Sequence, residues 1–166
     1  MYPSPSTLAH MVLGSTGYLD SFRARPAVDV AAFLEDYGLA WRIRPLGRFG
    51  GALILLDTDY YILTNALFLP TRQRLVAAHE FGHYLMHRGQ AQVFLCGADG
   101  RSIQERQAER FATELLMPTE IAWWLWRRGY RTPGKMGRVL GVSARAAGAR
   151  IAELGLRRNR RFSILG

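Results

Sequence analysis

The segment LVAAHEFGHYLMH, residues 75–87, holds three of the four histidines in this chain of 166 residues. His79 and His83 are four residues apart and Glu80 directly follows the first, which gives the pattern His-Glu-x-x-His. On a helix, side chains four residues apart lie one above the other, with Cβ atoms about 5–6 Å apart. Two imidazoles at this spacing can bind one metal ion, and Glu80 is placed to take a proton from water on that ion. We therefore expect His79 and His83 to be metal ligands and Glu80 to be a catalytic base.

The residues around this pattern predict a buried helix. Apolar side chains surround His79 on nearly every side; they are Leu75, Val76, Ala77, Ala78, Phe81, Leu85 and Met86. Buried polar side chains need partners, which a metal ion in a solvent-filled cleft would supply. The alternative is a pair of core histidines that hydrogen-bond to protein groups. His87 lies eight residues from His79, about 12 Å along the helix, so we expect it to support the site or end the helix rather than bind the same ion.

A site with two histidines normally takes a carboxylate from another element. The predicted helix SIQERQAERFATELLMP, residues 102–118, offers Glu105, Glu109 and Glu114. At 100° per residue, these glutamates lie about 60°, 100° and 120°, respectively, from the centre of the apolar stripe. Glu105 therefore borders the buried face, and the other two are expected to point more toward solvent. The spacing favours Glu105 as the third ligand, with Glu109 second, although Ser102-x-x-Glu105 also fits a capping box.

The rest of the chain predicts an α+β fold with a small, mostly antiparallel sheet. Alternation over residues 39–44 predicts a strand, and two β-rich runs at 52–56 and 60–64 flank a turn and predict a hairpin. We expect Tyr60–Thr64 to be an edge strand that could pair with an extended substrate, and Asn65 to be a turn residue. Helices are predicted over residues 26–38, 71–87 and 102–118, followed by further helices toward the C-terminal end.

We expect three parts along the chain. Residues 1–25 form a loose or partly helical lead-in, and residues 26–130 form the core. Residues 131–166 form a basic helical part that packs on the core and ends in an arginine-rich tail. Within it, residues 135–156 look like a helix-turn-helix pair, whose apolar side chains favour packing on the core over binding DNA.

The positive charge is concentrated near the C-terminal end. Residues 121–166 hold eleven of the 22 basic residues and one of the 13 acids, a net charge of +10, whereas residues 1–120 carry a net charge of −1. This asymmetry indicates either an acidic partner, such as nucleic acid, or a solubilising face. In a helix-turn-helix that binds DNA, Arg138, Arg145 and Arg150 would contact phosphates.

Composition predicts a cytoplasmic protein. The chain has no apolar run near the roughly 20 residues that span a bilayer, and its first residues lack the basic start of a signal peptide. Cys96 is the only cysteine, so no internal disulfide can form. A reducing compartment fits this cysteine usage.

The motifs together resemble those of the ImmA/IrrE family of metallopeptidases. The segments RQRLVAAHEFGHYLMH (72–87) and IQERQAERFATELLMP (103–118) match the family's paired motifs, and LGVSARAAGARIAELGL (140–156) is similar to its later helices. The resemblance covers residues 26–156. It implies a zincin-like domain with an active-site helix, followed by a helix-turn-helix-like C-terminal part. One departure is Glu109, where the family often has asparagine.

This resemblance also implies a site and a reaction. It assigns His79, His83 and Glu105 as ligands of Zn²⁺, with Mn²⁺ as an alternative, and Glu80 as the base. The implied substrate is a helix-turn-helix repressor in stress-response or mobile-element control, and nucleic acid is a further partner through the basic C-terminal part. The rival hypothesis is an antitoxin-like regulatory module that binds metal and a partner without proteolysis.

Overall fold

Among the residues that the structure describes, helices and strands both occur up to residue 96, and the described elements after it are helices. The computed structural model describes residues 3–89, 93–96 and 102–156. The described helices are α1 (Pro5–Ser15), α2 (Tyr18–Ser21), α3 (Val30–Asp36), α4 (Pro70–His87), α5 (Ile103–Leu116), α6 (Thr119–Arg127), α7 (Pro133–Leu140) and α8 (Ala144–Glu153). The strands are β1 (Ala40–Arg44), β2 (Gly51–Leu56), β3 (Asp59–Asn65) and β4 (Val93–Cys96). The predicted α+β class is confirmed.

The four strands form one mixed sheet in the order β1-β3-β2-β4. β2 pairs antiparallel with both β3 and β4, whereas β1 and β3 run parallel, so the prediction of a mostly antiparallel sheet is correct. The prediction that Tyr60–Thr64 is an edge strand is wrong. Tyr61 pairs with Ala40 on one side and Ile54 on the other, so β3 is an interior strand. Residue alternation shows that a segment is a strand, but it does not show which strands lie beside it.

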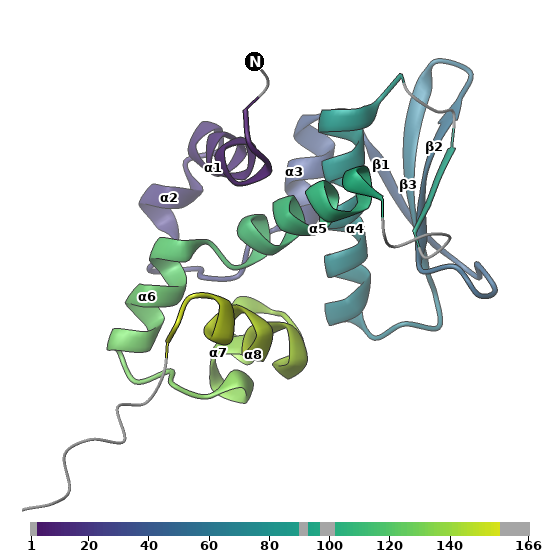
Figure 1. The fold of residues 1–166 in the computed structure, drawn as a ribbon. Coiled ribbons are helices and arrows are strands. Elements are labelled where there is room, and N and C mark those ends of the chain that lie inside the picture. Colours follow the sequence, from purple (N-terminus) through teal and green to yellow (C-terminus); the bar gives the residue numbers. More distant parts are fainter. Residues whose placement is uncertain (1–2, 90–92, 97–101, 157–166) are drawn as a thin grey trace, which may run out of the picture.

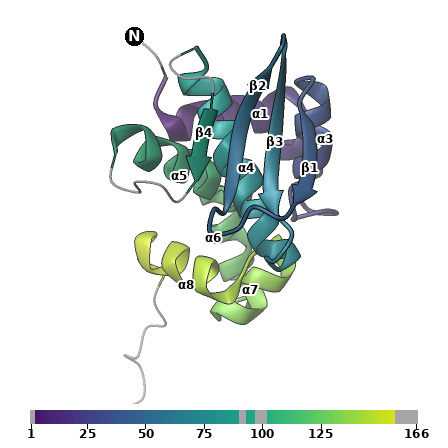
Figure 2. The same cartoon turned by 90° about the vertical axis from the view of Figure 1, so that its right-hand side faces the viewer.

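Helix α4 packs against the sheet and forms the centre of the described structure. It contacts β2, β3, α3 and α5, and it buries Val76, Ala77, Ala78 and Phe81. Figure 2 views the sheet with its strands in front, and α4 lies behind them. The prediction of a buried helix over residues 71–87 is therefore confirmed. Within the described residues, no helix combines the length and apolar character that crossing a bilayer requires.

The N-terminal residues that the structure describes form two helices. Helix α1 begins after Ser4, whose hydroxyl accepts a hydrogen bond from the amide of Thr7, and Pro5 occupies its first turn. Ala9, Val12 and Leu13 are buried, and α1 packs against α5 on the side away from the sheet (Figure 1). The N-terminal segment thus supports the helix that carries Glu105.

Arg74 joins α4 to the C-terminal helices. Its guanidinium donates hydrogen bonds to the carbonyl oxygens of Leu140 and Gly141 at the end of α7, and to that of Val28 before α3. Burial lowers the pKa of Arg74, and the carboxylate of Asp29 opposes this effect. Gly141 adopts a left-handed conformation (φ 66°), and a Cβ atom there would overlap the Arg74 side chain. Arg74 therefore has a structural role.

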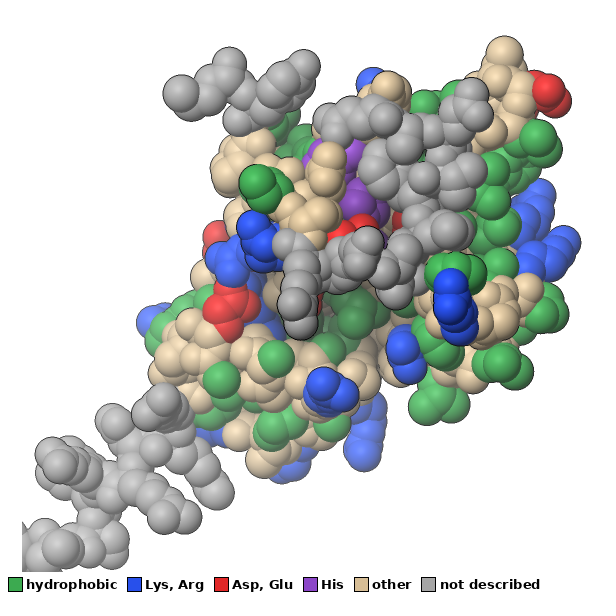
Figure 3. Space-filling view, turned by 45° about the vertical axis from the view of Figure 1, so that its right-hand side comes forward, with side chains coloured by type: hydrophobic (Ala, Val, Ile, Leu, Met, Phe, Trp, Pro, Cys, Tyr) green, Lys and Arg blue, Asp and Glu red, His purple; other side chains and the backbone are tan. Residues whose placement is uncertain are grey.

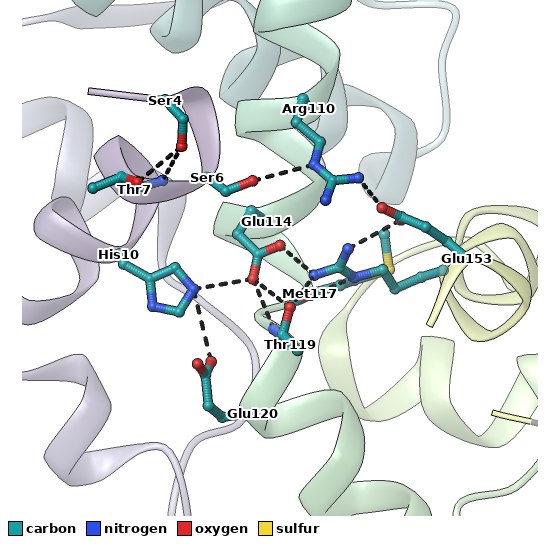
Figure 4. A network of polar contacts seen from close by, with 11 residues as sticks. Ser4, Ser6, Thr7, His10, Arg110, Glu114, Met117, Thr119, Glu120 and Glu153 are labelled. Atoms are coloured by element: carbon teal, nitrogen blue, oxygen red, sulfur yellow. Dashed lines mark hydrogen bonds and ion pairs between the residues drawn. The ribbon is translucent and has the colours of Figure 1, made fainter. Parts of the chain in front are cut away.

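A buried ion pair fixes α8 against α5 and α6. Arg150 donates hydrogen bonds to the carboxylate of Glu114, the hydroxyl of Thr119 and the carbonyl of Met117 (Figure 4). The prediction that Glu114 points toward solvent is wrong, because its side chain is only 2% exposed. The prediction used only the apolar stripe of α5, and this stripe gives no information about a partner on α8. Arg150 is also buried and so is not available to contact phosphates.

Candidate metal centre

Two helices bring three predicted site residues together. On α4, the Nε2 atoms of His79 and His83 are 3.1 Å apart. On α5, the carboxylate of Glu105 faces both rings, with Oε2 3.2 Å from Nε2 of His79 and Oε1 3.1 Å from Nε2 of His83. Ser102 caps the start of α5 by accepting a hydrogen bond from the amide of Glu105, which leaves the Glu105 carboxylate directed at the histidines.

The spacing of these atoms fits a metal ion. Four ligands at about 2.0–2.1 Å around a tetrahedral zinc ion lie about 3.3–3.4 Å from one another. Here the two Nε2 atoms are 3.1 Å apart, and each has one oxygen of the Glu105 carboxylate at 3.1–3.2 Å, separations close to those between neighbouring ligands in that tetrahedron. Two imidazoles and one carboxylate are also a donor set that zinc accepts in enzymes that keep a fourth position open.

The protonation states of two of these residues also suit a cation. Burial, together with the neighbouring His79, lowers the pKa of His83 to about 4. The hydrogen bond from His79 holds the pKa of Glu105 below its usual value, against the opposing effect of burial. At neutral pH, His83 is therefore a neutral imidazole and Glu105 a carboxylate, which are the forms that bind metal.

Glu80 directly follows His79 in the sequence and is fully buried, but its contacts differ from those of the histidines. Neither of its carboxylate oxygens makes a hydrogen bond of ordinary geometry among the described residues, and the backbone of Leu53 is only a weak donor to the group. Burial raises the pKa of Glu80 well above its usual value, and the charge of Glu105 adds to the rise, whereas the backbone of Leu53 has a smaller, opposite effect. An unpaired buried carboxyl group is costly, so its place in the site needs a functional reason.

Helices α4 and α5 pack closely at Gly82 of α4. A Cβ atom on Gly82 would lie 3.0 Å from the ring of Phe111 and 3.2 Å from the Cα atom of Ala108. Because the second contact is with the backbone of α5, a larger residue at position 82 must move that helix. The sequence pattern around the histidines did not reveal that Gly82 sets the spacing between Glu105 and the histidines.

Replacement of Gly82 by alanine is expected to lower stability by about 1–3 kcal/mol, the usual cost of overpacking, and to weaken zinc binding. Zinc affinity by chelator competition and urea unfolding would measure both effects. Gly14→Ala is the matched control, because Gly14 also lies on a helix but has no atom within 4 Å of its added Cβ. Unchanged zinc affinity in Gly82→Ala would contradict the idea that this contact sets the ligand spacing.

A second group of side chains has metal-ligand types but a structural role. His10, Glu114 and Glu120 offer atoms within 4.8 Å of one another. However, Glu114 already accepts hydrogen bonds from Thr119 and Arg150, and the Arg150 guanidinium supplies the positive charge (Figure 4). We therefore assign this group to the packing of α1, α5 and α8.

A groove of about 1230 Å³ begins at the metal centre and extends to α8. His79 and Glu105 lie on its wall together with Leu69 of the β3–α4 connection, and Ala146 of α8 lines another part. Figure 3 shows histidine and acidic side chains within a hollow of this face. Asn65 is not among the lining residues, and its side-chain amide instead donates hydrogen bonds to the carbonyls of Gly47 and Phe49, which supports its interpretation as a turn residue.

Comparison with known families gives one match. The family model described as the IrrE N-terminal-like domain, Peptidase M78, matches residues 34–152, which is more than half of the chain. The matched range contains all four predicted site residues and most of the C-terminal helix pair. A comparison with curated proteins finds no match.

Proposed function

Because the chain belongs to the IrrE N-terminal-like family, Peptidase M78, we propose that it is a zinc-dependent endopeptidase with His79, His83 and Glu105 as metal ligands. Family membership supports a metallopeptidase-type function. The observation that carries the proposal is that the Nε2 atoms of His79 and His83 lie 3.1 Å apart, and that each lies 3.1–3.2 Å from an oxygen of the Glu105 carboxylate. The same side chains would also accept manganese, which is the alternative metal.

The side chains divide the reaction between them. A bound zinc ion would act as a Lewis acid that activates water and polarises the scissile carbonyl. His79, His83 and Glu105 would hold that ion, and His79 and Glu105 line the groove through which a substrate would reach it. Glu80 accepts the proton of the attacking water on a carboxylate oxygen and then donates it to the nitrogen of the leaving amine. Its oxygens have no hydrogen-bond partner among the described residues that would compete for this proton.

The substrate that we propose is a protein, and specifically a helix-turn-helix repressor in the same cytoplasm. The groove supports a polypeptide substrate, because its volume of about 1230 Å³ exceeds the roughly 300–1,000 Å³ of common small-molecule sites. Its lining combines exposed leucines with arginines and glutamates. Such mixed walls suit a segment that presents both apolar and charged side chains.

A regulatory binding module is the second candidate function. A basic pocket of about 330 Å³ between α6 and α7 is lined by Arg128, Lys135 and Arg138, together with Tyr130. These three cations are exposed and could contact phosphate groups of nucleic acid. In this alternative the metal would be structural, and the repressor or its DNA would bind without being cut.

The deciding experiment incubates the purified protein with the repressor encoded by the neighbouring gene. We expect repressor fragments with zinc-loaded protein, no fragments after zinc removal by a chelator, and recovery when zinc or manganese is added back. Metal content is measured on the same samples. Fragments that form at full rate after metal removal would contradict the peptidase proposal, whereas repressor binding without cleavage by the metal-loaded protein would favour the binding module.

A further inference from the structure

A chain of hydrogen bonds continues from the metal centre to the interior side of α4 and α5. Nδ1 of His83 lies 3.1 Å from Nδ1 of His87, one helical turn further along α4. Nε2 of His87 lies 2.9 Å from Oε1 of Gln107 on α5. His87 is 3% exposed and so is shielded from bulk water. Glu105 and Gln107 lie two residues apart, so α5 supplies both the third proposed ligand and the end of this chain.

The donor and acceptor chemistry of the three groups fixes the positions of the protons. The amide oxygen of Gln107 can only accept, so Nε2 of His87 must carry the proton in that hydrogen bond. A neutral ring protonated at Nε2 has a lone pair at Nδ1, which can accept a hydrogen bond from His83. His83 is then protonated at Nδ1, and its own lone pair is at Nε2. That nitrogen is the atom that faces His79 and Glu105.

We propose that His87 and Gln107 are positioning residues that hold His83 in the tautomer and ring orientation needed to bind the metal. This inference rests on the proposed function, because the metal gives the tautomer its purpose. Without His87 to accept its Nδ1 proton, the His83 ring can rotate and the proton can move to Nε2. That move removes the lone pair that would bind the metal. Losing such an outer partner of a ligand histidine typically costs 10–100-fold in metal affinity.

A simple role for His87 at the end of the helix would make a different demand. Its position in the last turn of α4 would favour a positively charged ring, which interacts well with the helix dipole. A positively charged ring, however, carries protons on both nitrogens and cannot accept a hydrogen bond from His83. The two roles therefore differ in whether position 87 must provide an acceptor.

Three variants separate these roles. His87→Phe keeps a ring of similar size but removes the acceptor, and His87→Asn places an amide oxygen near the former Nδ1 position. Gln107→Leu leaves His87 in place but removes the group that fixes its proton. Gln104→Leu is the matched control, because Gln104 is an exposed glutamine on the same helix. Circular dichroism and thermal unfolding verify that each variant is folded.

The test measures zinc dissociation constants by chelator competition, together with long-range ¹H–¹⁵N spectra of zinc-loaded protein labelled at histidine. We expect wild-type His87 to be neutral and protonated at Nε2. Zinc affinity should fall about 10–100-fold in His87→Phe and fall in Gln107→Leu, but stay within about threefold of wild type in His87→Asn and Gln104→Leu.

Three results would overturn the inference. The first is wild-type zinc affinity in His87→Phe, and the second is an equal loss in His87→Asn and His87→Phe, which would indicate a need for the ring rather than an acceptor. The third is a wild-type His87 ring that is protonated at Nδ1. In each of these cases the wild-type protein still binds zinc, so the inference fails while the proposed metal site stands. A wild-type protein that binds no zinc would instead contradict the proposed function.

Discussion

Replacement of Glu80 by glutamine is expected to reduce peptide cleavage by a factor of about 10²–10⁴ while zinc binding is retained. Glutamine has nearly the same shape as glutamate, but its amide cannot accept and return the proton of the attacking water. Glu80 is not one of the three proposed ligands, so the metal should stay in place. Cleavage rate and zinc content, measured on the same preparation, would test both parts of this expectation.

Glu109→Gln provides the control for the charge change. Glu109 is exposed and lies one helical turn from Glu105, so its replacement also removes one acid near the site. We expect Glu109→Gln to keep its metal and to change the cleavage rate far less than Glu80→Gln does. A Glu80→Gln variant that cleaves at the wild-type rate would show that another group is the base, and loss of its zinc would show that Glu80 contributes to metal binding.

Replacement of Arg150 by methionine is expected to lower the free energy of unfolding by about 3–5 kcal/mol, the usual cost of leaving one half of a buried ion pair unpaired. The Arg150 side chain is fully buried, and its loss leaves the Glu114 carboxylate without its cation. Urea unfolding would measure the change. Arg145→Met is the control, because Arg145 lies on the same helix but is exposed. Equal stability of the two variants would contradict the structural role of this ion pair.

The same network predicts a pH dependence. Burial alone would raise the pKa of Glu114, but hydrogen bonds from Thr119 and the charge of Arg150 outweigh it, so the pKa is lowered. A carboxyl group with a lowered pKa in the folded state stabilises the protein above its unfolded pKa of about 4.3. That contribution is lost as the pH falls through the folded pKa. The stability advantage of wild type over Glu114→Gln should therefore be full above about pH 5 and shrink at lower pH, and an advantage that grows toward acid would contradict the assignment.

Much of the helix and strand pattern could be predicted because it depends on local sequence. The hairpin of β2 and β3, the histidine helix α4 and the capped start of α5 each have their own signals in periodicity or turn residues. His79 and His83 were paired by helical spacing alone, since residues four apart must lie on one face. Glu105 was favoured by the apolar stripe of its helix and then by resemblance to a family.

Other features depend on which elements meet, and local patterns do not contain that information. The interior position of β3 follows from β1, which lies beside it in parallel. Glu114 is buried because α8 brings Arg150 to it, although its own helix suggested a solvent-facing position. Gln107 had no sequence signal, because its contact with His87 exists only when α4 and α5 pack together.

The hydrogen bonds of Arg74 affect how parts of the molecule unfold locally. Its guanidinium is held by carbonyl oxygens from two distant segments, before α3 and at the end of α7. Detaching the C-terminal helices would remove the carbonyl oxygens of Leu140 and Gly141 from this half-buried cation in the helix that carries the histidines, which adds the cost of unmade hydrogen bonds to an opening there. Backbone amides in α4 and α8 should therefore exchange their hydrogens with solvent as one cooperative unit. The histidine helix and the basic helices are thus a single element of stability, although they lie far apart in the sequence.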